Sequence, residues 1–399
     1  MPWPLSRLDE VAEVAAGNPA PQEPSDFAED GHIFVRMQDV GREHHTDSLV
    51  ASTDKVSASA VSQYRLRLFP VGSLLIPKSG ASVNLNHRAM LGCDAYVVSH
   101  LAVVLPDRRK LLPEYLYYWS LSYDPRSQAQ TTSLPSLPLS LIKAALIPVP
   151  PLDEQCRIVD LLARADGIVR LRREAEKKTA ELIPTLFLDM FGDPATNPKG
   201  WPTSRLDAVL TETKLGLVRG AKEMDDQKPF PYLRMDVVGG GVVRAHDLKR
   251  VDATEKEAAE YSLRYGDFLF NTRNSKELVG KTGMFVGAEE PVILFNNNLM
   301  RMRFDDALLL PEYVNALFQT SYVQNQLEAI KRGTTSVFAI YYKDLRHLEL
   351  RVPPLHMQHV FARHVCSTNS VKIQQHEATM KAKETFDALL ASMFAPNPT

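Results

Sequence analysis

The stretch WPLSRLDEV begins at Trp3 and returns as WPTSRLDAV beginning at Trp201, 198 positions later. Seven of the nine residues are identical in the two stretches. A repeat at a fixed distance is typical of chains built from copies of one structural unit. The sequence therefore predicts that this protein contains one fold twice.

Three further segments repeat in the same order along the chain. The first two return after 198 positions and the third after 203, and the difference of five residues corresponds to one or two loop insertions. One match can arise by chance, but four matches in order indicate a duplication of nearly the whole chain. The three pairs are FVRM from Phe34 and YLRM from Tyr232, PEY from Pro113 and Pro311, and VPPL from Val149 and Val352, the last followed by Gln155 and Gln358.

Each copy begins with a stretch of about 150 residues that is rich in strand and turn signals. Short β-branched and aromatic runs, such as 74–76 and 96–98, lie between clusters of Gly, Pro and Ser. A helical pattern then follows a Pro-Pro pair. In the first copy we expect Asp153 to cap this helix and Glu154 to lie in its first turn, where the helix dipole favours an acid.

The two long helices are expected over 154–191 and 356–394. Apolar residues of the first recur at the spacing of a coiled-coil seam, and Pro184 is expected to kink its end. The second is less regular and cannot bury its apolar side alone, so antiparallel pairing satisfies both helices. Two independent helical tails are the alternative. The predicted seam residues are Ile158, Leu161, Ala165, Ile168, Ala175, Leu182 and Leu186 in the first helix, and Phe361, Val365, Val371, Met380, Phe386, Leu389 and Met393 in the second.

The predicted fold class is α+β, with two pseudo-repeated globular domains separated by two long antiparallel helices that form a coiled coil. The expected globular domains are 1–150 and 196–352. The expected helical segments are 151–195 and 353–395, followed by a short tail at 396–399.

The composition is that of a soluble globular protein, with 44% apolar and 24% charged residues among 399. The net charge of -2 gives no global electrostatic argument for nucleic acid, so a DNA binder of this composition must concentrate its basic side chains locally or borrow positive surface from a partner. No apolar run reaches membrane-spanning length, and the N-terminus has no export signal. The three cysteines are far apart. We therefore expect a cytoplasmic protein without structural zinc or disulfides.

The run IPVPPLDEQCRIV at 147–159, its weaker copy LRVPPLHMQ at 350–358 and the two WPxSRLDxV openings resemble the specificity subunit of type I restriction-modification systems. The resemblance implies two target recognition domains, each reading one half of a split DNA sequence, and two conserved helices that set the spacing and dock methyltransferase subunits. It implies double-stranded DNA, two modification subunits and restriction or translocase subunits as partners. It implies no cofactor, no membrane and no catalytic site of the chain's own.

The resemblance assigns partner docking to the starts of the two helices. The second copy departs from the acidic pattern, because His356 and His359 replace the acid-rich start. This departure raises the question of whether both helices dock partners equally. The docking residues are Pro150, Pro151, Leu152 and Gln155 in the first copy, and Pro353, Pro354, Leu355 and Gln358 in the second.

Two kinds of loop are candidates for DNA contact. One is the turn that follows each GxLL-type segment, where basic and amide side chains reach phosphates and base edges, and its alternative is an ordinary solvated hairpin. The other is a hydroxyl-rich loop before the final strands, for which turn chemistry alone is the alternative. Lys281, Arg301, Arg303 and Lys331 are candidates for additional basic surface. The candidate contacts are Lys78, Ser79, Gly80, Thr131, Thr132 and Ser133 in the first copy, and Asn271, Arg273, Asn274, Ser275, Lys276, Arg332, Gly333, Thr334, Thr335 and Ser336 in the second.

No motif for catalysis is complete. The segment Gly280-Lys281-Thr282 resembles the end of a phosphate-binding loop, but Ser275 occupies the position of the required glycine. His356 and His359 lack a third metal ligand at suitable spacing. We find neither the glycine-rich loop and Asn/Asp-Pro-Pro-aromatic tetrapeptide of an amino-methyltransferase nor a nuclease motif. A tandem coiled-coil scaffold that binds protein rather than DNA is the alternative function.

Overall fold

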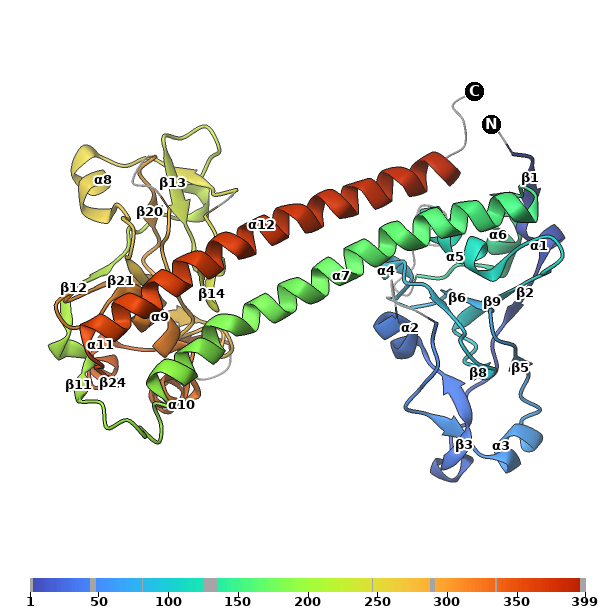
Figure 1. Cartoon of the computed structure of the whole chain (residues 1–399), viewed down its shortest axis with the longest axis horizontal. Coiled ribbons are helices and arrows are strands. Elements are labelled where there is room, and N and C mark those ends of the chain that lie inside the picture. The colour runs from blue at the N-terminus through green and yellow to red at the C-terminus, as the bar shows by residue number, and fades with distance from the viewer. Residues whose placement is uncertain are drawn as a thin grey trace. The chain divides into compact units, whose positions relative to one another are not determined.

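The computed structural model describes residues 3–43, 48–80, 82–124, 135–245, 247–287, 291–333 and 336–394, and it combines helices and sheets (Figure 1). The chain divides into two compact units. Unit 1 contains Met1–Arg173 and Glu377–Thr399, and unit 2 contains Glu174–His376. Each division falls inside a long helix, so both long helices contribute residues to both units.

Unit 1 begins and ends its globular part with strands that pair with each other, β1 and β10. The order of elements is β1 (Leu5–Arg7), α1 (Leu8–Val11), β2 (Ala12–Ala16), η1 (Pro24–Asp26), β3 (Phe27–Val35), α2 (Met37–Glu43), β4 (Lys55–Val56), α3 (Ala58–Gln63), β5 (Leu68–Phe69), β6 (Leu74–Pro77), α4 (Ser82–Leu85), β7 (Ala89–Met90), β8 (Ala95–Val97), β9 (Leu101–Pro106), α5 (Pro113–Ser122), α6 (Leu139–Ala144) and β10 (Leu146–Pro148), followed by the long helix α7 (Leu152–Phe191).

The globular part of unit 2 is likewise enclosed by a strand pair, β11 and β24. Its elements are β11 (Thr203–Arg205), η3 (Leu206–Ala208), β12 (Leu210–Leu215), η4 (Ala221–Glu223), β13 (Phe230–Leu233), η5 (Met235–Val237), β14 (Val238–Gly239), β15 (Gly241–Val243), β16 (Arg250–Val251), α8 (Glu255–Tyr261), β17 (Phe268–Asn271), β18 (Arg273–Asn274), β19 (Thr282–Met284), β20 (Leu294–Phe295), β21 (Leu299–Phe304), α9 (Pro311–Phe318), α10 (Ser321–Ile330), β22 (Arg332–Gly333), β23 (Phe338–Ala339), α11 (Tyr342–Leu345) and β24 (Glu349–Arg351), followed by the long helix α12 (Leu355–Phe394).

The sheets of the two units share one topology. Unit 1 has a sheet of order β2-β9-β6-β7, and unit 2 has β12-β21-β17-β19, extended by β15 and β14. The parallel pair of β3 and β8 corresponds to the parallel pair of β13 and β20. The inner strands β6 and β17 are buried throughout, which explains why their sequences are continuous apolar runs rather than alternating ones.

The turn before each inner strand requires glycine. Gly72 has φ +87° and Gly266 has φ +85°, a left-handed conformation that residues with a Cβ rarely adopt. A Cβ on either glycine would also approach the ring of Pro113 or Pro311 to 3.1 Å. The repeated Gly and Pro therefore mark one contact that is present in both units.

A tyrosine at the start of the following helix fixes the last strand in the same way in both units. The hydroxyl of Tyr115 donates to the carbonyl of Pro148 at 2.9 Å, and the hydroxyl of Tyr313 donates to the carbonyl of Arg351 at 3.0 Å. Both side chains are fully buried, and burial raises the pKa of both hydroxyls. The predicted duplication is thus present in the contacts of the fold as well as in its sequence.

Helices α7 and α12 each contain 40 residues, and their limits agree closely with the predicted ones. Asp153 was expected as the N-cap, which is wrong, because the helix already begins at Leu152 and the carbonyl of Pro151 accepts its first backbone hydrogen bonds. Asp153 and Glu154 both lie in the first turn, where the helix dipole favours acids. The helix continues through Pro184 to Phe191.

The predicted seam is only partly correct. In α7, Leu161, Ile168 and Leu182 are 41%, 49% and 53% exposed, whereas Leu162 and Val169 are buried. In α12, Val371 and Met380 are 44% and 45% exposed, and the other predicted seam residues are buried or packed against the core. In each unit the buried side of both helices packs against the globular part as well as against the other helix. The buried positions therefore do not follow the simple coiled-coil spacing.

Within each unit the two helix segments run antiparallel. In unit 2 the end of α7 meets the beginning of α12, since the rings of Phe191 and Phe361 lie 5.4 Å apart. In unit 1 the beginning of α7 shares a core with the end of α12, and Phe394 lies 5.2 Å from Tyr115. The equivalent contact in unit 2 joins Phe191 and Tyr313 at 4.9 Å. The helices are therefore part of the core of each unit.

Candidate nucleic-acid interface

The repeated glutamines at the starts of the long helices are structural. The side chain of Gln155 accepts the backbone N–H of Leu112 at 2.9 Å and donates to the carbonyls of Lys110 and Pro150. Gln358 makes the same three bonds to the loop before α9 and to Pro353. Both side chains are fully buried. The predicted role of these two glutamines in partner docking needs correction. Their side chains are not available to a partner, because all their polar atoms form hydrogen bonds inside their own unit.

The other residues assigned to docking divide by exposure. Pro150 and Pro353 are buried, whereas Pro151, Leu152 and Pro354 are exposed and Leu355 is half-buried. His356 and His359 are exposed in the first turns of α12. Only the exposed side chains offer surface to another protein.

In unit 1 the candidate turn after β6 is held by backbone pairing. Ser79 forms a β-bridge with Ser136, and the N–H of Gly80 donates to the carbonyl of Pro135 at 2.9 Å. The Ser79 hydroxyl shares a 2.7 Å hydrogen bond with Nδ1 of His100. Lys78, Ser79 and Gly80 are all half-buried. Thr131, Thr132 and Ser133 lie outside the described residues, and the bridge places Ser136 beside the turn.

In unit 2 the two candidate segments come together in one small sheet of order β18-β23-β22. Strand β18 carries Arg273 and Asn274, and β22 carries Arg332 and Gly333. Lys276 follows β18, and its carbonyl accepts a hydrogen bond from Nζ of Lys331. Arg273, Lys276, Arg332, Gly333 and Ser336 are exposed, Asn274 and Ser275 are half-buried, and Thr334 and Thr335 lie outside the described residues.

Asn271 was expected to contact DNA, but the structure buries it. Its residue is 1% exposed, because it is the last residue of β17 and pairs with Leu299 of β21. Its backbone N–H donates to the carbonyl of Lys281, and its carbonyl accepts the N–H of Gly280. The Asn271 side chain is therefore buried beneath the loop and cannot contact DNA.

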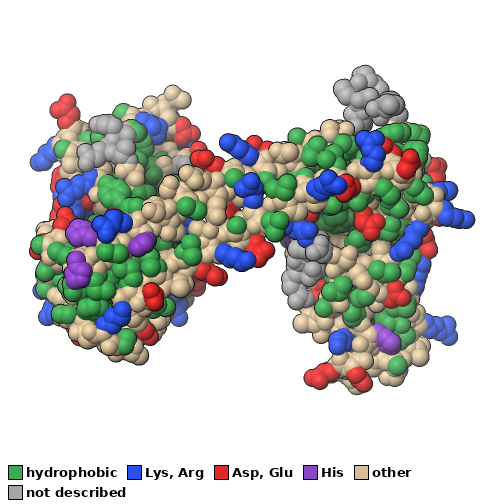
Figure 2. All heavy atoms as spheres, viewed as in Figure 1, with side chains coloured by type: hydrophobic (Ala, Val, Ile, Leu, Met, Phe, Trp, Pro, Cys, Tyr) green, Lys and Arg blue, Asp and Glu red, His purple; other side chains and the backbone are tan. Residues whose placement is uncertain are grey.

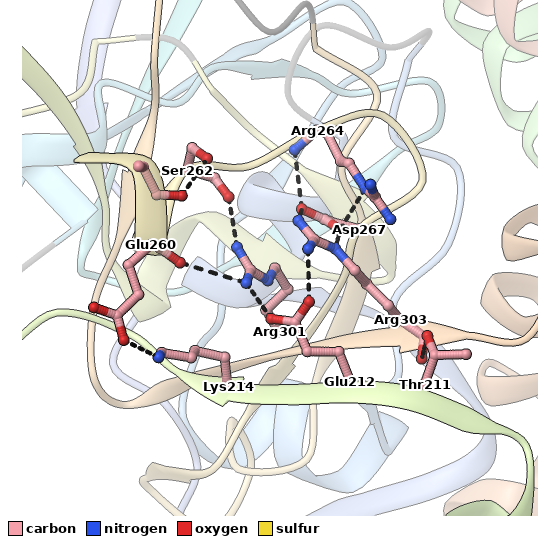
Figure 3. Close-up of polar contacts among 10 residues, drawn as sticks. Thr211, Glu212, Lys214, Glu260, Ser262, Arg264, Asp267, Arg301 and Arg303 are labelled. Carbon is pink, nitrogen blue, oxygen red and sulfur yellow. Dashed lines mark hydrogen bonds and ion pairs between the residues drawn. The ribbon is translucent and has the colours of Figure 1, made fainter. Parts of the chain in front are cut away.

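Arg301 and Arg303 were considered as basic surface, and this is also wrong. Figure 3 shows both side chains inside a network with Glu212 and Asp267. Arg303 makes two hydrogen bonds to the Asp267 carboxylate, at 2.6 and 3.1 Å, and a third to Glu212. Arg301 is 4% exposed and contacts Glu212 and the carbonyl of Ser262. Their charge is neutralised within the unit.

The network shifts the acidity of its members. Burial alone would raise the pKa of Glu212. The hydrogen bonds and charge interactions with Arg301 and Arg303 lower this pKa by more than burial raises it, so the net shift is downward. The hydrogen bonds that Arg303 donates to Asp267 raise the pKa of Arg303. The network thus favours the charged forms of Glu212 and Arg303.

Sequence reasoning missed Asp267 and Glu212. A signal existed, because the alternation in LMRMRF at 299–304 places Arg301 and Arg303 on one face of a buried strand, where two cations require acids nearby. The matching acids are distant in sequence, and only the sheet order brings them together.

The surface in view has no single basic patch. Figure 2 shows Lys and Arg side chains interspersed with Asp and Glu.

Among the described residues, no group of three or more His, Cys, Asp or Glu side chains is placed to hold a metal ion. None of the helices that the structure describes is both long and apolar enough to cross a bilayer.

Comparisons with known proteins agree with these features. Residues 1–182 match the family model of the type I restriction modification DNA specificity domain. The type I restriction enzyme EcoKI specificity subunit of Escherichia coli K12 is 25% identical over an alignment of 266 positions, which covers 62% of this chain and only 56% of that subunit. The MjaIX specificity subunit of Methanocaldococcus jannaschii is 23% identical over 98% of this chain and 92% of its own length.

Two solved structures share the fold over the whole chain. The S subunit of the type I restriction-modification system from M. genitalium has a TM-score of 0.56 at 12% identity, covering 100% of this chain and 97% of that one. A chain from a structure of the type I R-M system has a TM-score of 0.58 at 21% identity, covering 98% and 97%. Residues 1–182 thus match the type I restriction modification DNA specificity domain, and the chain as a whole is similar to type I restriction-modification specificity subunits.

Proposed function

We propose that this chain is the sequence-specific DNA-binding subunit of a type I restriction-modification system. It reads a bipartite, asymmetric DNA target and directs partner methyltransferase and restriction subunits to that target. The two readers are the globular domains 1–150 and 196–352. The helical segments 151–195 and 353–395 set the distance between the half-sites, and 396–399 is a tail.

The observation that carries the proposal is the duplicated globular fold with diverged loops at equivalent positions. Two like domains in one chain suit a duplex target with two half-sites. The loops after β6 and β17 differ in sequence, with Lys78-Ser79-Gly80 in the first and Arg273-Asn274-Ser275 in the second, so the half-sites are expected to differ as well. The family match of residues 1–182 supports DNA as the ligand.

The chain contributes recognition and its partners contribute catalysis. We assign partner docking to the exposed sides of the long helices. In unit 1, α7 exposes Leu161, Ile168 and Leu171, the last by 68%. The residues 203 positions later in α12 are His364, Val371 and Gln374, of which only Val371 is apolar. The first docking surface is therefore expected to bind a methyltransferase subunit more tightly than the second.

The proposal is tested by selecting DNA from a randomised library with the chain assembled with its methyltransferase subunits. We expect enrichment of one sequence with two constant parts and an unspecified spacer of fixed length. The tandem scaffold alternative predicts normal assembly without any enriched sequence, and that outcome would remove the proposal. The methyltransferase subunits alone are the control for nonspecific DNA binding.

A further inference from the structure

The small sheet of unit 2 places two arginines in one row. Strand register pairs Arg273 with Ala339 and Ala339 with Arg332. Side chains that lie directly opposite each other on neighbouring strands point to the same face of the sheet. Since neighbouring strands are about 4.8 Å apart, the two arginine backbones are separated by about 10 Å. An alanine, which adds little bulk, lies between them.

Both guanidinium groups are available to a ligand. Arg273 is exposed, and its side chain has no hydrogen bond or ion pair with any residue that the structure describes. The Arg332 side chain is 65% exposed, and its Nε lies 3.8 Å from a carboxylate oxygen of Asp344, beyond hydrogen-bond distance. This contrasts with Arg301 and Arg303 of the same unit, whose donors are occupied by Glu212 and Asp267.

The surroundings favour a neutral hydrogen-bond acceptor over an anion. The Asp344 carboxylate beside Arg332 repels a phosphate but not an uncharged base edge. Guanine presents two acceptors, O6 and N7, that match the two-pronged guanidinium group. A separation of about 10 Å corresponds to roughly three base-pair steps at 3.4 Å each.

We propose that Arg273 and Arg332 read two guanines, about three base-pair steps apart, in the half-site bound by unit 2. This inference rests on the proposed DNA-reading function. In unit 1 Ser79 occupies the position of Arg273, since its bridge with Ser136 corresponds to the pairing of Arg273 with Ala339. A serine hydroxyl offers one donor instead of the two parallel donors of a guanidinium group, so the guanine pair belongs to one half-site only.

The test repeats the DNA selection with complexes that carry Arg273→Ala, Arg332→Ala or Arg273→Lys. We expect the wild-type motif to contain two G:C pairs about three steps apart in one half-site. Each alanine variant relaxes one of these positions, keeps the other half-site, and binds the full wild-type site about 5- to 150-fold more weakly. Arg273→Lys keeps the charge but loses the planar pair of donors, so it relaxes the same position as Arg273→Ala.

Salt dependence distinguishes base contact from phosphate contact. If the arginines bind phosphates, binding to all sequences weakens equally and the slope of log K against log salt falls by about 0.9 per arginine. That result, or an unchanged motif in both alanine variants, overturns the inference while the proposed function stands. Failure of the wild-type complex to select any motif overturns the proposed function itself. Arg109→Ala is the control, because Arg109 is 88% exposed in unit 1 and carries the same charge; its complex should select the wild-type motif.

Discussion

Replacing Asp267 with Asn should destabilise unit 2 by about 3 kcal/mol or more, because removing one partner of a buried ion pair leaves the other charge uncompensated. Asp267 is 1% exposed and accepts two hydrogen bonds from Arg303 and one from the backbone N–H of Arg264. Asn keeps the shape of the side chain but not its charge. Hydrogen exchange read peptide by peptide should show loss of protection in β17 and β21, with β6 and β9 unchanged.

The matched control for this variant is Ser73→Ala in unit 1. Ser73 occupies the position of Asp267 after the repeated glycine, and its hydroxyl donates to the carbonyl of Pro70 at 2.7 Å. Its loss should cost only about 1 kcal/mol. A second variant, Asp267→Asn with Arg303→Met, should be more stable than Asp267→Asn alone, because it removes the surplus positive charge that remains when Arg301 and Arg303 share Glu212. If the double variant is the less stable of the two, the uncompensated charge is not the cause.

Replacing Gln358 with Leu should destabilise unit 2 by about 2 to 4 kcal/mol, because buried polar groups without partners keep their full desolvation cost. The substitution preserves approximate volume but leaves the N–H of Leu310 and the carbonyls of Leu308 and Pro353 without the bonds that Gln358 supplies. The start of α12 and the loop before α9 should then exchange faster in the same hydrogen-exchange experiment.

Two controls locate this effect. Gln155→Leu removes the equivalent bonds and should loosen unit 1 rather than unit 2. Gln374→Leu changes an exposed glutamine of the same helix and should alter stability by less than about 0.5 kcal/mol. Equal effects of the Gln358 and Gln374 variants would mean that helix composition, and not the buried bonds, explains the loss.

Much of the fold was predictable because its signals are local or repeated. The strands expected at 74–76 and 96–98 coincide with β6 and β8 to within a residue. The second long helix was expected to begin at His356 and begins at Leu355. Apolar periodicity, Pro-Pro pairs and the repeat itself all act over short stretches, so sequence alone reveals them.

The choice of buried face was less predictable. Leu161 and Leu162 are adjacent and equally apolar, yet only Leu162 is buried. The aromatic side chains of α5, such as Tyr115, share a core with the buried side of α7 and so help to determine which leucine turns inward. Those contacts join residues far apart in sequence, and helical spacing does not encode them.

The candidate site was predictable by residue type but not by accessibility. Asn271 and Arg273 differ by two positions, and one ends a buried strand while the other begins an exposed one. Arg301 and Arg332 are the same residue type, but Arg301 is buried against Glu212, whereas Arg332 is exposed and its Nε lies 3.8 Å from Asp344. The row that joins Arg273 to Arg332 depends on strand register across 59 positions of sequence and becomes visible only in the sheet.

Genome-wide mapping of methylated adenines tests the central claim most directly. The mapping compares a strain with the intact gene, a strain without it, and a strain in which each long helix is shortened by about two turns, or roughly seven residues. We expect one bipartite motif to disappear with the gene. In the shortened strain it should return with the same half-sites and a spacer shorter by about three base pairs, since two turns measure roughly 10.5 Å. Unchanged methylation without the gene, or altered half-sites in the shortened strain, would contradict two readers held apart by paired helices.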